Sequence, residues 1–150
     1  MDKTKEIIAA LKRAYAGEFE TLQNYVAHGV HLQGTVPEVI GTSLEASISQ
    51  KLKNVRRLAR RINVLGGRVP GSLELPRAQD YFQPGAEKAD APAVIQGVLR
   101  ASAAAIARYE TIIALTEGND YLTQDLVIDL LSHERDLHQL FTGLLGNLGA

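Results

Sequence analysis

The chain carries, at residues 67–92, the segment GRVPGSLELPRAQDYFQPGAEKADAP, which holds four of its five prolines and shows no sustained hydrophobic period. Prolines without a helical or alternating pattern predict an extended connection. A connection of this length is unusual in a compact domain and needs a structural reason. About 25 extended residues can run back along a helix that is roughly 40 Å long. We therefore expect a crossover that lets the segments on its two sides run parallel.

Four segments with helical periodicity flank this crossover, two on each side, and glycine, proline or Asn/Asp signals separate them. The second ends at Gly66-Gly67, and Gly118-Asn119-Asp120 predicts a short turn between the last two. Two helical hairpins joined by one long crossover form an all-α four-helix bundle. We expect one domain over residues 1–150, with the crossover at 67–92 and helices over about 4–32, 39–65, 92–116 and 121–145.

The composition excludes several classes of protein. Of the 150 residues 45% are hydrophobic, the net charge is -1, and cysteine is absent. Such a chain can build a core, and it has no disulfide or thiolate chemistry. The balanced charge gives no reason to expect nucleic acid or a membrane surface as partner. The sequence lacks a signal peptide and a stretch of about 18 apolar residues, so we expect a cytoplasmic protein.

Polar residues interrupt the apolar stripe near the middle of each predicted helix. They are Glu18, Lys51, Ser102 and Glu134. If the helices pack as a bundle, the four side chains can meet at one level of the core. A buried carboxylate is costly without a metal, a cation or a proton, so two glutamates near a lysine form a physically meaningful set.

Several motifs resemble those of ferritins and bacterioferritins, in the ferritin-like superfamily. In EFETLQNY, Glu18 precedes Tyr25 by seven residues, as on the first helix of that family. The register of RRINVLGG places the KLKN residues Lys51 and Asn54 where the family has Glu-x-x-His. The resemblance implies six di-iron ligand positions, of which only two keep a glutamate. These positions are Glu18, Lys51, Asn54, Ser102, Glu134 and Leu137.

The resemblance therefore implies a degenerate metal site. Our hypothesis is that Lys51 replaces the metal charge and bridges Glu18 and Glu134. The alternative is that Lys51 extends sideways to water and that both glutamates lie on a wet flank. Tyr25, Tyr109 and His138 are possible lining residues, and no residue is assigned a catalytic role. If a metal binds at all, the candidate ligands are Glu18, Glu134 and His138.

Other features favour ordinary structural roles. We interpret His28, His31, His133 and His138 as surface or capping groups, and the basic run at residues 51–61 as a solvated helix face. Leu52 stands where bacterioferritin has its haem-binding methionine, so we expect no haem.

Three functions remain open. The first is a ferritin-like protein without ferroxidase activity, and hence no enzyme, that has a structural, ligand-binding or partner-binding role. The second is a divergent iron-binding or iron-storage protein, whose cofactor would be iron and whose role would lie in iron homeostasis. The third is a metal-free helical enzyme that uses the buried Glu/Lys set. We expect a homodimer. The chain stops soon after the fourth helix, so the short fifth helix that closes ferritin cages is not expected.

Overall fold

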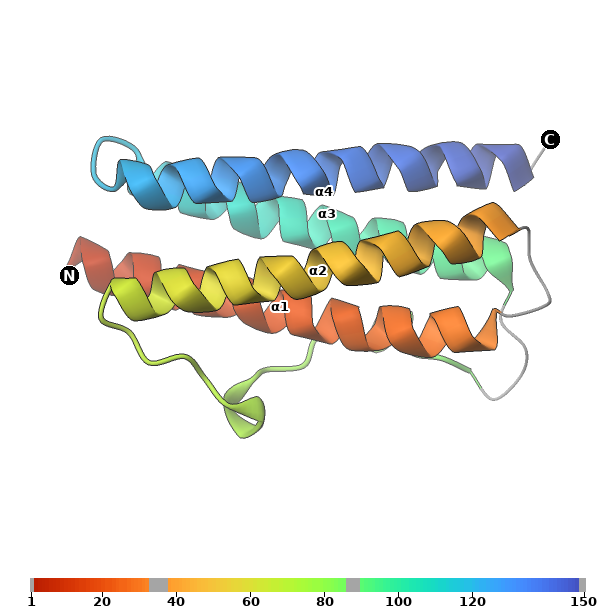
Figure 1. Cartoon of the computed structure of the whole chain (residues 1–150), viewed down its shortest axis with the longest axis horizontal. Helices are drawn as coiled ribbons and strands as arrows, with labels where there is room; N and C mark the ends of the chain where they lie inside the picture. The colour runs from red at the N-terminus through yellow and green to blue at the C-terminus, as the bar shows by residue number, and fades with distance from the viewer. Residues whose placement is uncertain (1, 33–37, 86–89, 149–150) are drawn as a thin grey trace.

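A computed structural model describes residues 2–32, 38–85 and 90–148. It contains four long helices and two short 3-10 turns, and no strand occurs among the described residues (Figure 1). The predicted all-α bundle is confirmed. The elements are α1 (Lys3–His31), α2 (Glu38–Val64), η1 (Ser72–Glu74), η2 (Asp80–Phe82), α3 (Ala91–Thr116) and α4 (Tyr121–Leu148).

The helix ends follow the sequence signals. Asp2 caps α1, because its Oδ1 accepts a hydrogen bond of 3.0 Å from the backbone N–H of Thr4. Gly66 and Gly118 adopt positive φ values of 90° and 68° directly after α2 and in the turn after α3, which glycine does at low cost. The expected end of the last helix at residue 145 is wrong, because α4 continues through Gly146 to Leu148. The predicted turn at residues 34–37 lies outside the described residues.

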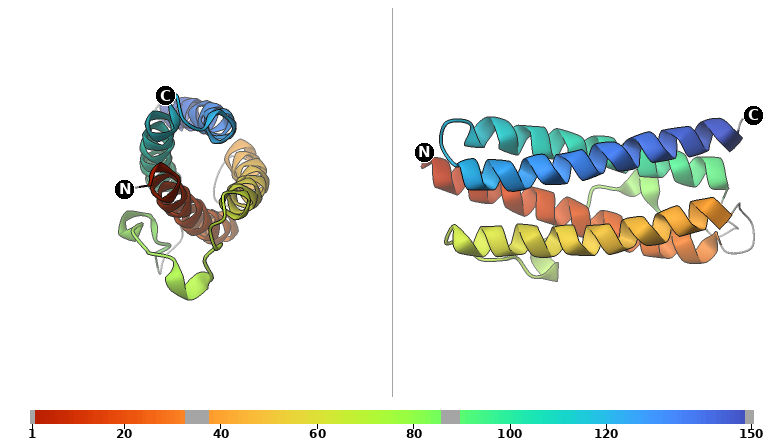
Figure 2. Two further views of the ribbon diagram at one scale, coloured as in Figure 1. Left: turned by 90° about the vertical axis from the view of Figure 1, so that its left-hand side faces the viewer. Right: turned by 45° about the horizontal axis from the view of Figure 1, so that its top comes forward.

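The crossover has the predicted topology. α2 and α3 run in the same direction, and each packs beside its hairpin partner (Figure 1). The connecting segment leaves the end of α2, forms η1 and η2, and runs along the outside of the bundle (Figure 2). The expectation of a connection without helix needs one small correction, because two single 3-10 turns interrupt the extended chain.

Two apolar clusters fill the bundle, one toward each end. Leu11, Leu58 and Leu130 belong to the first, and Tyr25 and Phe141 to the second. The central level between the clusters is polar and holds the residues that interrupt the four stripes. Within the described residues, no helix is long and apolar enough to cross a membrane.

Phe82 of the crossover packs directly on Gly97 of α3, where an added Cβ would collide with the phenyl ring. We predict that Gly97→Ala destabilises the protein by about 1–3 kcal/mol through overpacking. Gly143→Ala is the matched control, because Gly143 also lies within a helix but has nothing within 4 Å of the added carbon. It should stabilise by up to about 1 kcal/mol through helix propensity. Urea unfolding of both variants measures the difference, and equal effects would contradict the packing argument.

Candidate functional site: a buried ion cluster

Lys51 lies at the centre of the polar level, between carboxylates from two other helices. Its Nζ donates a hydrogen bond of 3.0 Å to Glu18 Oε1 of α1 and a second to Glu134 Oε1 of α4. The side chains of Lys51, Glu18 and Glu134 are 3%, 1% and 2% exposed. Lys51 therefore does not reach sideways to water, and the alternative of a wet flank is wrong. The three residues form a buried ion cluster.

The other stripe residue, Ser102 of α3, completes the contact among four helices. Its Oγ donates a hydrogen bond of 2.9 Å to Glu134 Oε2. Each oxygen of Glu134 therefore has a donor, one charged and one neutral. Asn54 is also buried, but its Oδ1 accepts from the Nε2 of Gln50 at 3.0 Å.

Burial and neighbouring charges shift the pKa of Lys51 and of Glu134. Burial by itself lowers the pKa of Lys51, but the adjacent Glu18 and Glu134 outweigh it, and the net pKa is raised above the ordinary lysine value. Burial raises the pKa of Glu134, against the opposing effect of Lys51. The cluster therefore holds its ammonium proton firmly, while burial disfavours the ionised form of Glu134.

Two tyrosines flank the cluster. Among the described residues, the buried hydroxyls of Tyr25 and Tyr109 and Oε2 of Glu18 have no partner within ordinary hydrogen-bond geometry, although Glu18 is near enough to act on the Tyr109 phenol as a hydrogen-bond neighbour. Burial raises the pKa of both phenols, and Glu18 and Glu134 add to this effect. Both phenols therefore remain protonated, and each hydroxyl can donate one hydrogen bond and accept another. The two side chains predicted to line the site are thus positioned around it.

The remaining predicted residues lie apart from the cluster. Leu137 packs against the second apolar cluster. His138 borders an open groove of α3 and α4, together with Ile106 and Arg135. Within the described part of the chain, Glu18, Glu134 and His138 do not form a group arranged to hold a metal.

The donor set does not fit a di-iron centre. Such a centre requires several carboxylates and imidazoles around two cations. Here the central position holds an ammonium group that already binds both glutamates. Among the described residues, no group of three or more His, Asp or Glu side chains is arranged to hold a metal.

The expectation that all four histidines are surface or capping groups is wrong for His28. This side chain is only 6% exposed, and its Nε2 lies 2.9 Å from the carbonyl oxygen of Phe82. The crossover covers it, which a helix pattern alone does not reveal. Sequence reasoning also missed Gln79 of the crossover, which is buried and bound to α1. A glutamine in a proline-rich connection carries no periodic signal.

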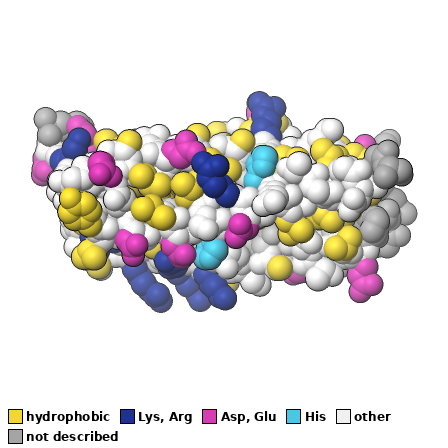
Figure 3. All heavy atoms as spheres, turned by 90° about the horizontal axis from the view of Figure 1, so that it is seen from above, with side chains coloured by type: hydrophobic (Ala, Val, Ile, Leu, Met, Phe, Trp, Pro, Cys, Tyr) yellow, Lys and Arg dark blue, Asp and Glu magenta, His cyan; other side chains and the backbone are white. Residues whose placement is uncertain are grey.

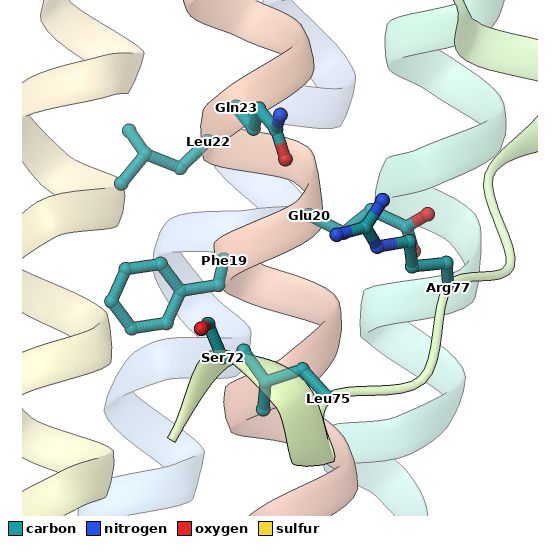
Figure 4. A pocket seen from close by; sticks show the side chains of 7 residues that line it. All are labelled: Phe19, Glu20, Leu22, Gln23, Ser72, Leu75 and Arg77. Carbon is teal, nitrogen blue, oxygen red and sulfur yellow. The ribbon is translucent and has the colours of Figure 1, made fainter. Parts of the chain in front are cut away.

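The described surface contains shallow grooves. One of about 240 Å³ lies between α1 and the crossover, with Phe19, Leu22 and Leu75 as its apolar lining and Arg77 at its edge (Figure 4). On the face that includes α4, acidic, basic and apolar side chains are interspersed (Figure 3). Neither surface brings together buried charged side chains as the ion cluster does, so the ion cluster is the stronger candidate site.

Replacing Lys51 by methionine should destabilise the bundle by about 3–5 kcal/mol at neutral pH, because two buried carboxylates lose their partner. Lys5 is exposed on α1, and Lys5→Met should change stability by less than about 0.5 kcal/mol. Chemical unfolding monitored by circular dichroism measures both.

The pH dependence gives a second measure of the same prediction. Because the folded pKa of Lys51 is raised, its contribution is fully present below the unfolded lysine pKa of about 10.4 and is lost as the pH rises through the folded value. In the Lys51→Met variant the deficit should instead shrink toward acid pH, where the glutamates become protonated. A deficit that is independent of pH would contradict the ion cluster as its cause.

Comparison with known proteins places this geometry in a family. A model of the ferritin-like domain matches residues 8–149. The DNA protection during starvation protein of Pyrococcus furiosus is 27% identical over 147 residues, covering 93% of this chain and 78% of that protein.

Solved structures agree on the fold. The bacterioferritin-related thioferritin of Bacteroides fragilis superposes with a TM-score of 0.89 at 24% identity, covering 99% of this chain and 89% of that one. For the bacterioferritin of Desulfovibrio desulfuricans the TM-score is 0.85 at 15% identity, and the coverage is 99% and 82%. On the family match over nearly its whole length, the chain belongs to the family of ferritin-like domains.

Proposed function

We propose that this chain is a ferritin-like protein without ferroxidase activity, in which Lys51 takes the place of the di-iron centre. The observation that carries the proposal is the hydrogen bonding of one ammonium group to Glu18 and Glu134, one carboxylate from each helical hairpin. The role left to such a bundle is structural or in binding a partner or small ligand.

The physical support is that a lysine meets the same need as a metal ion. Two buried carboxylates require positive charge, and a buried charge without a partner is strongly destabilising. Lys51 supplies that charge from within the chain. It also excludes cations, because a divalent ion would have to displace a covalently tethered ammonium group and would meet its repulsion.

A divergent iron-binding role is the second candidate, because the Desulfovibrio desulfuricans relative is described with a diiron site. In this chain such iron would need ligands outside the ion cluster. Asp129 and His133, one turn apart on α4 with Oδ1 and Nε2 4.0 Å from each other, are a partly exposed pair that could contribute, if iron displaced Arg57 from Asp129 Oδ2.

Purified without chelator, the wild-type protein should contain no stoichiometric iron, and it should not accelerate iron(II) oxidation by oxygen. Elemental analysis and an absorbance assay measure these quantities. Lys51→Glu is the informative variant, because it removes the ammonium group and adds a third carboxylate at the same position. It should gain affinity for divalent cations, measured by calorimetry with Mn²⁺.

The control for this experiment is Lys5→Glu, which changes the charge equally at an exposed position of α1 and should gain no such affinity. Stoichiometric iron in the wild-type protein that disappears in a Glu18→Gln, Glu134→Gln double variant would overturn the proposal. Iron that persists in that variant would instead support the second candidate.

We also propose that the chain forms a homodimer through the outer face of α2. Exposed Glu38 and Glu45 lie toward the start of this face, and exposed Lys53 and Arg60 toward its end. None of the four has an ion pair among the described contacts. If a second copy packs antiparallel about a two-fold axis near Ser49, Glu45 faces Lys53 and Glu38 faces Arg60, which is a self-complementary pattern.

The assembly can be tested by reversing charge. A Lys53→Glu, Arg60→Glu variant should lose self-association by about tenfold or more, because like charges then meet in the interface. Mixing it with a Glu38→Lys, Glu45→Lys variant should restore a mixed pair. Arg135→Glu on α4 serves as the control. Sedimentation velocity measures the species.

A monomeric wild-type protein, or an assembly unaffected by the reversal, would contradict the proposed interface. The Bacteroides fragilis relative is described as dodecameric, so the same experiment should also ask whether a larger assembly contains the pair. A dodecamer that the Lys53→Glu, Arg60→Glu variant breaks apart would place the α2 contact within it.

A further inference from the structure

A row of polar side chains on α1 binds the crossover. Glu20, Thr21, Asn24 and His28 follow one another along the helix, and each contacts a residue between 78 and 82. An extended segment has no ladder of its own for its backbone groups, so these side chains provide the partners.

The first half of this attachment is centred on Gln79. The Glu20 carboxylate accepts hydrogen bonds from the backbone N–H groups of Ala78 and Gln79, at 3.0 and 2.9 Å. The amide of Gln79 donates to Thr21 Oγ1 at 2.6 Å and accepts from Asn24 Nδ2 at 3.0 Å. Charge-assisted and buried hydrogen bonds of this kind are the stronger ones in proteins, and each has a defined direction.

The second half is centred on Phe82. Its carbonyl oxygen accepts from His28 Nε2 at 2.9 Å, and its ring stacks on the imidazole with centroids 4.6 Å apart. The edge of the phenyl ring meets Tyr25 at 5.8 Å between centroids. The ring also fills the space above Gly97, so one side chain of the crossover fits between α1 and α3.

Tyr25 connects this attachment to the ion cluster. Its ring contacts Phe82, and the charges of Lys51, Glu134 and Glu18 act on the pKa of its buried hydroxyl. Tyr25 therefore lies between the crossover and the ion cluster. Phe82, a member of the second apolar cluster, therefore links the crossover to Tyr25.

We propose that residues 78–82 form a releasable latch over Tyr25, and that its release admits water and small cations to the ion cluster. Within residues 78–82, Phe82 is buried in the second apolar cluster, but the hydrogen bonds from Ala78 to Glu20 are exposed. The helices are held by continuous ladders and by both clusters. Segments held in part by exposed backbone hydrogen bonds open at lower free energy than the core. The view that the ion cluster substitutes for a metal rests on the proposed function. The proposal that residues 78–82 can open does not depend on it.

The experiment follows the reactivity of the Lys51 amine. Full-length wild-type protein and a Glu20→Ala variant are exposed to an amine-acylating reagent under native conditions, and peptide mass spectrometry gives the rate at Lys51. Exposed Lys5, at the start of α1 and outside the proposed dimer interface, reports reagent activity. Loss of the Glu20 acceptor should raise the Lys51 rate about tenfold or more, together with the hydrogen-exchange rate of the amides at 78–82, while the Lys5 rate stays constant.

Glu110→Ala is the matched control, because Glu110 is an exposed helical glutamate whose ion pair with Arg135 lies away from the latch. Gln79→Ala is a second latch variant that leaves α1 unchanged and should act in the same direction. Circular dichroism establishes that each variant is folded.

Faster exchange at 78–82 without faster modification of Lys51 would overturn the proposal. So would a Lys51 rate that equals the global unfolding rate in every variant. Iron content is measured separately. Stoichiometric iron in the wild-type protein would refute the proposed function, whereas the Lys51 modification rates test the latch independently.

Discussion

The attraction between the Lys51 ammonium group and two glutamates is the constraint on which the interior depends. It joins α2 to α1 and to α4, and Ser102 adds α3 through Glu134. Apolar contacts on either side tolerate small displacements, because they have no direction. The ion cluster does not, since a slip of one helical turn would leave a charge buried without a partner. It therefore fixes the relative register of all four helices.

The periodic parts of the fold could be predicted from the sequence. Helix count, direction and crossover follow from stripes that step by three and four and from prolines gathered in one segment. The contact of Lys51 with Glu18 and Glu134 could also be predicted, because all three interrupt an apolar stripe near the centre of their helix and so lie at one level of the bundle. Helix ends were less accurate. α4 passes through Gly146 because one exposed glycine costs only about 1 kcal/mol, which neighbouring contacts can offset.

The attachment of the crossover could not be predicted in the same way. His28 looks like a surface histidine when α1 is considered alone, and it becomes buried only because Phe82 lies across it. Gln79 has no periodic neighbour that would indicate burial. The placement of the buried Tyr25 and Tyr109 hydroxyls likewise depends on side-chain positions that spacing does not specify. These are long-range contacts between an irregular segment and a helix, and they leave no local pattern.

The ion cluster also limits how the chain can change during evolution. A substitution at Lys51 alone leaves two carboxylates buried without a cation, and it should be removed by its cost in stability. A histidine gained at position 54 or 137 alone meets an ammonium group where a metal would have to bind, so it brings no advantage. Each single step toward a metal centre is therefore harmful or neutral, although several together could be favourable. Lys51 is therefore the residue whose replacement would have to be accompanied by changes in its surroundings.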